Sequence, residues 1–326
     1  MEQAGGGGAR AGVLAWIPPR LRQALRHCPE TPPWLEIRLR LGNPLLVLTA
    51  AGEMWVGAGG AVPAPAQALC CAAEDIEQAV QLITRGSLYA WERELREGFC
   101  TLPGGHRVGL AGRARTERGR VVGQTAFAAI NIRVARQVRG AADALLLRLG
   151  RRWPEEAVLL FGPPGSGKTT VLRDLCRQLS EGNPRLGLAP RRVVVVDERS
   201  ELAAAVEGRP QFDLGPRSDV LDGWPKRDGL LAAIRALGPQ VVACDELGGP
   251  GDAQAVAEAA RCGVQVLATA HATRVEDLWH RPGLRRLLAG GVFGVLLGLG
   301  ADRQPRECVF LDAAEPRARR RLWLRA

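Results

Sequence analysis

Lysine is almost absent from this sequence. Only two of its 44 basic residues, Lys168 and Lys226, are lysine, and all the others are arginine. Codon usage in a GC-rich genome would produce such a skew. The formal net charge of +10 could mark a surface for nucleic acid or anionic lipid. Because the arginines are dispersed along most of the chain, we favour the plainer interpretation of solvated side chains.

Aromatic residues and long apolar runs are scarce as well. Aromatic side chains make up 5% of the chain and form no cluster that could stack nucleic-acid bases. The longest apolar stretch, residues 291–301, is far shorter than the ~20 residues that cross a bilayer, so any membrane contact is expected to be peripheral. Residues 1–12 lack the basic and apolar segments of a signal peptide.

The cysteines show no pattern of a disulfide framework or a zinc site. None of the eight belongs to a C-x-x-C pair, and no set of them has zinc spacing with histidine. Reduced thiols in a cytosolic protein are the simplest interpretation. A small disulfide-stapled module is excluded, and a chain of 326 residues with 46% apolar residues suggests about two globular domains.

The first predicted domain, residues 13–140, is α+β. Apolar and polar residues alternate at 35–41, which predicts a half-buried strand, and 74–84 has the apolar spacing of an amphipathic helix. Strands predicted at 99–102 and 107–110 flank a Pro-Gly-Gly turn.

The second predicted domain, residues 141–314, is α/β. Short apolar runs rich in β-branched residues alternate with helical stretches, which is typical of βαβ units around a parallel sheet buried on both faces. The runs lie at 158–161, 193–196, 241–244, 264–268 and 292–297. We also predict a flexible N-terminus at 1–12 and a basic tail at 315–326, which carries Arg317, Arg319, Arg320, Arg321 and Arg325.

The strongest motif in the chain matches G-x-x-x-x-G-K-[ST], the P-loop, which binds nucleotide phosphates. Its glycines let backbone N–H groups point at the phosphates, and the helix that follows adds its dipole. Lys168 is expected to reach the β- and γ-phosphates of ATP, and Thr169 to ligate Mg²⁺. The alternative is a glycine-rich turn with an exposed lysine. The residues predicted to bind ATP are Gly162, Pro163, Pro164, Gly165, Ser166, Gly167, Lys168, Thr169 and Thr170.

Two carboxylates follow the apolar run at 241–244. Asp245 would hold the Mg²⁺ ion, directly or through water, and Glu246 is placed to polarise the attacking water as a general base. The pair favours hydrolysis over nucleotide storage. The alternative is a pair of solvated acids at the end of a strand.

Two further strand ends carry polar candidates. The run at 193–196 precedes Asp197 and Glu198, and acids at the carboxyl end of a parallel strand face the ligand side of the sheet. We predict a catalytic role for Glu198, against the alternative of an exposed turn with a local ion pair. The run at 264–268 leads to Thr269 and His271, which could contact the γ-phosphate and report its presence. The alternative for His271 is an ordinary loop histidine.

Four features follow one another along the chain: the P-loop, the acids at 197–198 (acidic box), the Asp245-Glu246 pair (Walker B box) and His271 (histidine box). This series resembles the secretion-superfamily ATPases of type II and type IV systems. More closely, nearly the whole chain beyond about residue 35 resembles the stage III sporulation protein AA family of endospore-forming bacteria. The glycine-rich start and the arginine-rich end have no counterpart in that resemblance, and the tetracysteine zinc module of many type II ATPases is absent. The matching phrases lie at 99–114, 131–136, 162–170, 195–202, 219–229, 234–248 and 268–272.

The resemblance implies a RecA-like P-loop ATPase that forms a hexameric ring in the mother-cell cytoplasm. It would act as a motor or assembly ATPase, peripheral to the membrane, at a membrane-embedded channel that links mother cell and forespore. In the ATPases it resembles, the N-terminal domain packs over a nucleotide site and supplies arginines. The candidates to act in trans are Arg107, Arg113, Arg133 and Arg136, although each could be an ordinary exposed arginine.

Two other functions stay open. A P-loop protein that binds single-stranded nucleic acid would fit the net charge of +10. However, none of the four histidines has an arginine four residues before it, as the R-x-x-x-H binding module of such proteins requires, so we do not expect nucleic acid as a partner. A nucleotide-binding scaffold without hydrolysis is the third function, and Glu246 argues against it.

Overall fold

The computed structural model describes residues 12–87, 91, 99–149, 157–301, 305–311 and 319–323. The chain divides into two compact units, Met1–Gln137 and Val138–Ala326. Residues 1–11 of the predicted flexible N-terminus, and Arg317 and Arg325 of the predicted basic tail, lie outside the described residues.

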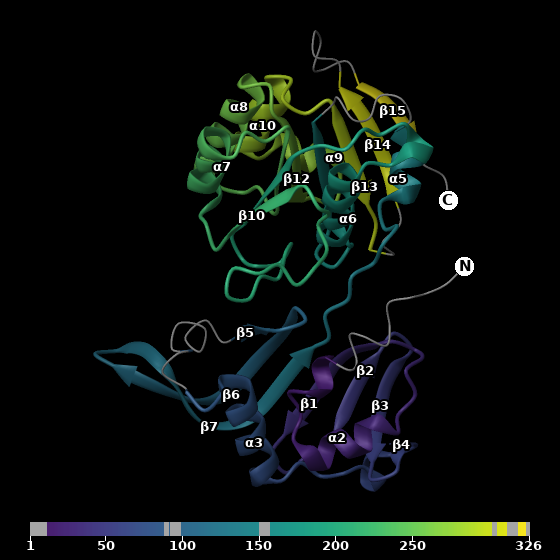
Figure 1. Ribbon diagram of the computed structural model, residues 1–326, viewed down its shortest axis with the longest axis vertical. Helices are drawn as coiled ribbons and strands as arrows, with labels where there is room; N and C mark the ends of the chain where they lie inside the picture. Colours follow the sequence, from purple (N-terminus) through teal and green to yellow (C-terminus); the bar gives the residue numbers. More distant parts are fainter. Residues whose placement is uncertain are drawn as a thin grey trace. The chain divides into compact units, whose positions relative to one another are not determined.

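The first unit is built on a seven-stranded antiparallel sheet with the order β4-β3-β2-β1-β7-β6-β5 (Figure 1). Two helices, α2 (Pro19–Arg26) and α3 (Ala73–Thr84), contribute to the apolar core on this sheet. The strands are β1 (Trp34–Arg40), β2 (Leu46–Thr49), β3 (Gly52–Gly57), β4 (Gly60–Val62), β5 (Phe99–Leu102), β6 (His106–Glu117) and β7 (Arg120–Arg133).

The local sequence accounts for β1 and α3. In β1, Ile37 and Leu39 are fully buried, and the residues between and beside them are half-buried, as expected where alternate side chains point to opposite faces. Helix α3 begins where Asp75 fixes its first turn, since the Asp75 carboxylate accepts the Ala72 N–H at 2.8 Å. The strand and the helix predicted here are confirmed, each within one residue of the predicted ends.

Strands β6 and β7 continue past the other strands of the sheet as a long two-stranded ribbon (Figure 1). Residues 111–120 of this ribbon are all exposed. Gly112 is required there, because a Cβ at this position would lie 2.5 Å from the carbonyl oxygen of Thr125 on the facing strand. The prediction of a strand at 107–110 therefore captured only the buried beginning of β6.

The second unit is built on an eight-stranded sheet with the order β10-β9-β11-β12-β8-β13-β14-β15. The first six strands in this order run parallel, and β14 and β15 are antiparallel to their neighbours. The strands are β8 (Val158–Gly162), β9 (Val193–Asp197), β10 (Ser218–Asp222), β11 (Val241–Cys244), β12 (Gln265–His271), β13 (Val295–Leu299), β14 (Pro305–Leu311) and β15 (Arg319–Trp323). The helices are α5 (Asp143–Leu149), α6 (Lys168–Glu181), α7 (Lys226–Ala236), α8 (Pro250–Arg261), α9 (Val275–Trp279) and α10 (Pro282–Ala289).

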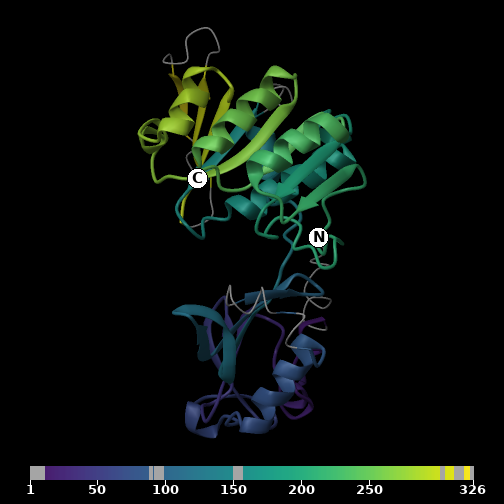
Figure 2. The ribbon, with the colours of Figure 1, turned by 90° about the vertical axis from the view of Figure 1, so that its left-hand side faces the viewer.

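Helices cover both faces of this sheet. Alternate strand residues enter two separate cores: Val158 and Leu160 pack with α5 and α6, whereas Leu159 and Phe161 pack with α7 to α10. Figure 2 shows α7, α8 and α10, in green and yellow-green, against that second face. The predicted parallel sheet, buried on both faces, is confirmed. Among the described residues the longest helix, α6, has 14 residues, and none is long and apolar enough to span a membrane.

Three strands of this sheet are missing from the sequence-based predictions. Strand β10 is an edge strand whose residues are only half-buried or exposed, so it lacks the apolar run that marks a central strand. Strands β14 and β15 form an antiparallel extension of the sheet. Because β15 pairs with β14, the segment 315–326, predicted as a separate tail, contains a strand of this sheet.

Candidate active site

The P-loop connects the end of β8 to the start of α6. Gly165 and Gly167 have φ values of 76° and 87°, in the left-handed region that favours glycine. A Cβ at Gly162 would lie 2.5 Å from the Ser166 Oγ and 2.6 Å from the Leu299 carbonyl oxygen. The backbone path therefore requires glycine at all three positions of the motif, and the loop ends at the N-terminus of α6.

The side chain of Lys168 is buried and folded back on the loop. Its Nζ donates to the carbonyl oxygens of Gly162 and Pro163, each at 3.0 Å. Burial lowers the pKa of the Lys168 ammonium, and the carboxylates of Asp245 and Glu246 partly oppose that shift. The buried Ser166 Oγ has no hydrogen-bond partner within the described part of the chain. These donors fit an anionic ligand, which would replace the carbonyl oxygens as the acceptor for Lys168.

Thr169 and Asp245 lie together at the carboxyl ends of the strands. The Thr169 hydroxyl donates to the Asp245 Oδ2 at 2.7 Å. The Thr269 hydroxyl donates to the Asp245 Oδ1 and accepts the backbone N–H of Glu246 at 2.8 Å, so the carboxylate is fixed from a second side. A hydroxyl beside one carboxylate fits Mg²⁺, which is commonly held by one or two carboxylates together with substrate phosphates and water.

Glu246 is held between a histidine and an arginine. His271 Nε2 lies 2.7 Å from the Glu246 Oε1, and Arg199 Nη1 lies 3.3 Å from the Glu246 Oε2. The Lys168 Nζ lies 3.3 Å from the other ring nitrogen of His271, Nδ1. Because an ammonium can only donate, Nδ1 must accept, and Nε2 carries the hydrogen that is donated to Glu246. Glu246 has a φ of 52°, a strained conformation of the kind that clusters at functional sites.

The end of β9 forms a rigid turn beside these groups. The buried Asp197 carboxylate accepts the backbone N–H groups of Glu201, Leu202 and Ala203 at 2.8 to 2.9 Å. Burial raises the pKa of Asp197, and the three N–H donors oppose that shift. The next residue, Glu198, is ion-paired with Lys226.

A small cavity of about 10 Å³ joins this turn to the catalytic candidates. Glu198 is thus brought to the same cavity as the Asp245 and Glu246 carboxylates. Its lining residues are Asp197, Glu198, Arg199, Glu201, Lys226, Asp245 and Glu246. Sequence reasoning missed Arg199 and Lys226 as members of the site, although the scarcity of lysine was a signal for Lys226. Thr269 was expected near the γ-phosphate, and its contacts in the structure are with Asp245 and the Glu246 N–H.

The four candidate trans arginines lie in the first unit. The Arg107 guanidinium stacks over the Phe99 ring, 4.2 Å from its centroid, and Arg133 Nε lies 3.8 Å from a carboxylate oxygen of Glu36. Arg113 and Arg136 are exposed. Their action on a P-loop stays a prediction.

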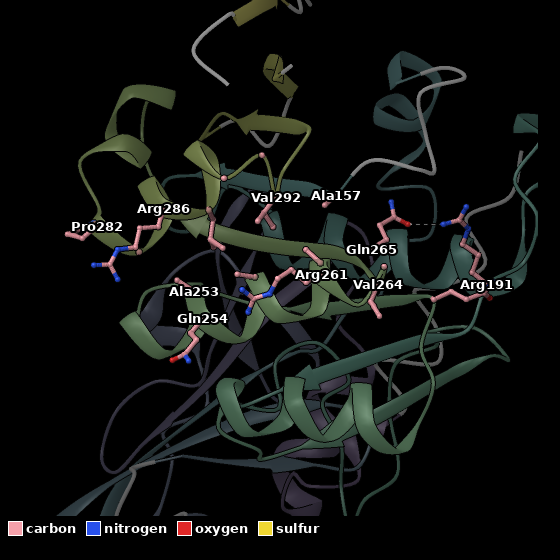
Figure 3. A pocket seen from close by; sticks show the side chains of 18 residues that line it. Ala157, Arg191, Ala253, Gln254, Arg261, Val264, Gln265, Pro282, Arg286 and Val292 are labelled. Carbon is pink, nitrogen blue, oxygen red and sulfur yellow. Dashed lines mark hydrogen bonds between the residues drawn. The ribbon is translucent and has the colours of Figure 1, made fainter. Parts of the chain in front are cut away.

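A larger pocket, of about 1070 Å³, lies at the opposite, amino-terminal ends of the strands. Figure 3 shows it between α8 and α10, with Arg261 and Arg286 beside it and Arg191 bonded to Gln265 at 3.1 Å. It contains none of the predicted site residues. The acidic motifs line the smaller cavity, and the P-loop reaches them through the contacts of Lys168 with His271 and of Thr169 with Asp245.

The sequence of the chain matches one family model and several known proteins. A model of the family described as sporulation stage III, protein AA, matches residues 11–312. The stage III sporulation protein AA of Bacillus subtilis (strain 168) is 39% identical over 89% of this chain and 90% of its own length. The protein SEEDLING PLASTID DEVELOPMENT 1 of Arabidopsis thaliana is 30% identical over 59% of this chain and 26% of its own length.

Two solved structures share the fold over most of the chain. The ATPase DotB of Legionella pneumophila has a TM-score of 0.53 at 16% identity, covering 88% of this chain and 79% of its own. The pilus retraction motor PilT, solved with bound ADP, has a TM-score of 0.54 at 16% identity, covering 90% of this chain and 80% of its own. The predicted fold, a RecA-like α/β core preceded by a smaller α+β domain, is confirmed.

Proposed function

The chain belongs to the family of sporulation stage III protein AA, and from that premise we propose that it hydrolyses ATP to ADP and phosphate. The observation that carries the proposal is the chain of contacts Lys168–His271–Glu246, with the Thr169–Asp245 pair beside it. A phosphate-binding lysine, a metal-binding pair and a candidate base belong to one cluster of side chains.

The P-loop residues bind and orient the nucleotide. Lys168 exchanges the carbonyl oxygens of Gly162 and Pro163 for phosphate oxygens, and the loop N–H groups and the dipole of α6 add to the positive field. Thr169 and Asp245 would hold Mg²⁺, which neutralises charge on the phosphates when bound.

Glu246 acts on the attacking water as the general base. His271, neutral and donating from Nε2, fixes one oxygen of the Glu246 carboxylate, and Arg199 fixes the other. When phosphate takes Lys168 away from His271 Nδ1, the imidazole is free to reorient. His271 thereby couples the presence of the γ-phosphate to the orientation of the Glu246 carboxylate. Glu198, at the end of the neighbouring strand β9, lines the same small cavity as Glu246 and is the second catalytic carboxylate in this proposal.

The wider role extends the family assignment. The active form is a homo-oligomer, a hexameric ring, located in the mother-cell cytoplasm and peripheral at the membrane. There it would power a membrane-embedded channel between mother cell and forespore. The family description, which concerns sporulation, and the fold shared with DotB and PilT support this proposal.

Phosphate release measured against protein concentration tests activity and assembly together. We expect specific activity to rise with concentration as subunits assemble, because a ring whose sites lie between subunits is inactive as a monomer. Specific activity that is constant over the whole concentration range would contradict the oligomeric site, and an absence of phosphate release would contradict the hydrolysis itself.

The alternative function, nucleotide-dependent binding of single-stranded nucleic acid, is favoured by one observation. The exposed β6–β7 ribbon carries Arg113, Arg115, Arg118 and Arg120 within ten residues. Cationic binding of that kind weakens steeply as salt rises. A salt titration of single-stranded DNA or RNA binding, run beside the phosphate-release assay, separates the two functions.

A further inference from the structure

Lys226 is a lysine in a chain that otherwise uses arginine. Of the 44 basic residues only Lys168 and Lys226 are lysine, and the P-loop motif specifies lysine at position 168. Lys226 lies outside the P-loop, in the stretch 219–229. Since arginine fills every other basic position, the lysine at 226 points to a site where a guanidinium does not serve.

The position of Lys226 is electrostatically unfavourable. It is the first residue of α7, where the helix dipole is positive and repels a cation. Only 8% of the residue is exposed, so the ammonium has also lost most of its hydration. A solvated surface lysine would show neither feature. Neighbouring carboxylates must supply the attraction that offsets the helix dipole and the lost hydration.

Those carboxylates belong to the active site. Lys226 Nζ is ion-paired with Glu198, and Lys226 lines the small cavity that Asp245 and Glu246 also line. The residue after Glu198 is Arg199, whose guanidinium lies 3.3 Å from Glu246. Charges therefore alternate from α7 to the candidate base: Lys226, Glu198, Arg199, Glu246.

The turn that carries Glu198 and Arg199 is anchored on both sides of this pair. Asp197 accepts three backbone N–H groups on one side. On the other, the Ser200 hydroxyl donates to the Asp222 Oδ1 at 2.6 Å. Only Lys226 is ion-paired to the Glu198 side chain among the described residues. Loss of that ion pair would free Glu198 to approach and compete for Arg199.

We propose that Lys226 is a positioning residue for hydrolysis. Its ion pair with Glu198 keeps that carboxylate away from Arg199. Arg199 therefore stays bonded to Glu246, and the Glu246 carboxylate stays oriented towards the attacking water. This inference rests on the proposed ATP hydrolysis. A compact ammonium fits the small cavity as a point charge, whereas the larger planar guanidinium of an arginine would have to enter it with five donors in a fixed fork.

The test uses the full-length chain and four variants. Lys226→Met removes the charge with little change of volume, and Lys226→Arg keeps the charge but changes its shape. Glu198→Gln removes the partner, and the double variant of Lys226→Met with Glu198→Gln closes a double-mutant cycle. Arg227→Met is the matched control, because Arg227 is the next residue on α7 and is exposed.

We expect kcat to fall at least about tenfold in both Lys226 variants, with KM and the affinity for an ATP analogue changed by less than about threefold. The double variant is expected to lose no more than Lys226→Met alone, since both changes act through one contact. Arg227→Met should keep the wild-type kcat. If Lys226→Met does not fold, Lys226→Arg decides the matter by the same two measurements.

Wild-type kcat in either Lys226 variant would overturn the inference, as would a loss that appears only in KM or only in thermal stability. Additive losses in the double variant would also overturn it, because the two residues would then act independently. A wild-type chain that releases no phosphate would instead contradict the proposed hydrolysis, so the two failures are distinguishable.

Discussion

His106 makes the stability of the first unit depend on pH. Its side chain is fully buried, its Nδ1 accepts the Ala135 N–H at 3.1 Å, and its Nε2 has no hydrogen-bond partner within the described residues. Burial lowers the pKa of His106 from 6.5 to about 4. In the unfolded chain the imidazole is solvated and returns to its ordinary pKa.

The unfolded state therefore binds more protons than the native state between pH 6.5 and pH 4. Stability is fully present above the unfolded pKa and is lost as the pH falls towards the folded pKa. With these two pKa values the loss between pH 7 and pH 5 is about 2 kcal/mol, and it approaches ~3 kcal/mol at pH 4.

Urea titrations of the full chain at pH 7 and pH 5 measure this loss. Hydrogen-exchange mass spectrometry on peptides from β1 and β7 follows the first unit apart from residues 138–326. His106→Asn is the control, since an amide oxygen can accept the Ala135 N–H without titrating. We expect the wild type to lose about 2 kcal/mol more than this variant over the interval. Equal losses in the two proteins would refute the burial argument.

Three predictions concern the nucleotide site and its assembly. Thr169→Val should weaken Mg²⁺-dependent binding of a fluorescent ATP analogue by at least about tenfold, because one charge-assisted contact is lost; unchanged binding would remove Thr169 from the metal site. His271→Ala should keep the affinity for ATP but lose the difference between its affinities for ATP and for ADP. A variant that still discriminates between the two nucleotides would make His271 merely structural. Mixing Lys168→Ala protein with Arg113→Ala or Arg133→Ala protein should restore phosphate release through intact composite sites, and no restoration at any concentration would exclude action in trans.

The sequence was most informative where function and fold depend on nearby residues. The P-loop was predictable because its lysine and threonine lie within eight residues of glycines that the backbone path requires. The core strands were predictable because β8, β9 and β11 are buried along their whole length and read as continuous apolar runs. Edge strand β10, with only partial burial, has no such run.

The parts that the sequence did not predict depend on contacts between distant segments. Arg199 meets Glu246 across 47 positions, and Lys226 meets Glu198 across 28. Neither pair has a local pattern, because each depends on the packing of β9 beside β11 and of α7 against β9. The Thr269 hydroxyl that orients Asp245 is likewise placed by the register of β12 beside β11.

Hydrolysis by Glu246 is the central claim, and phosphate release by the Glu246→Gln variant tests it most directly. The amide keeps the size of the side chain but cannot accept a proton, so binding of ATP should stay within about threefold of the wild type while release falls by about 10² to 10⁴. Lys168→Ala, which removes the phosphate contact, is the control that should lose binding and release together. Release at the wild-type rate by Glu246→Gln would contradict the account.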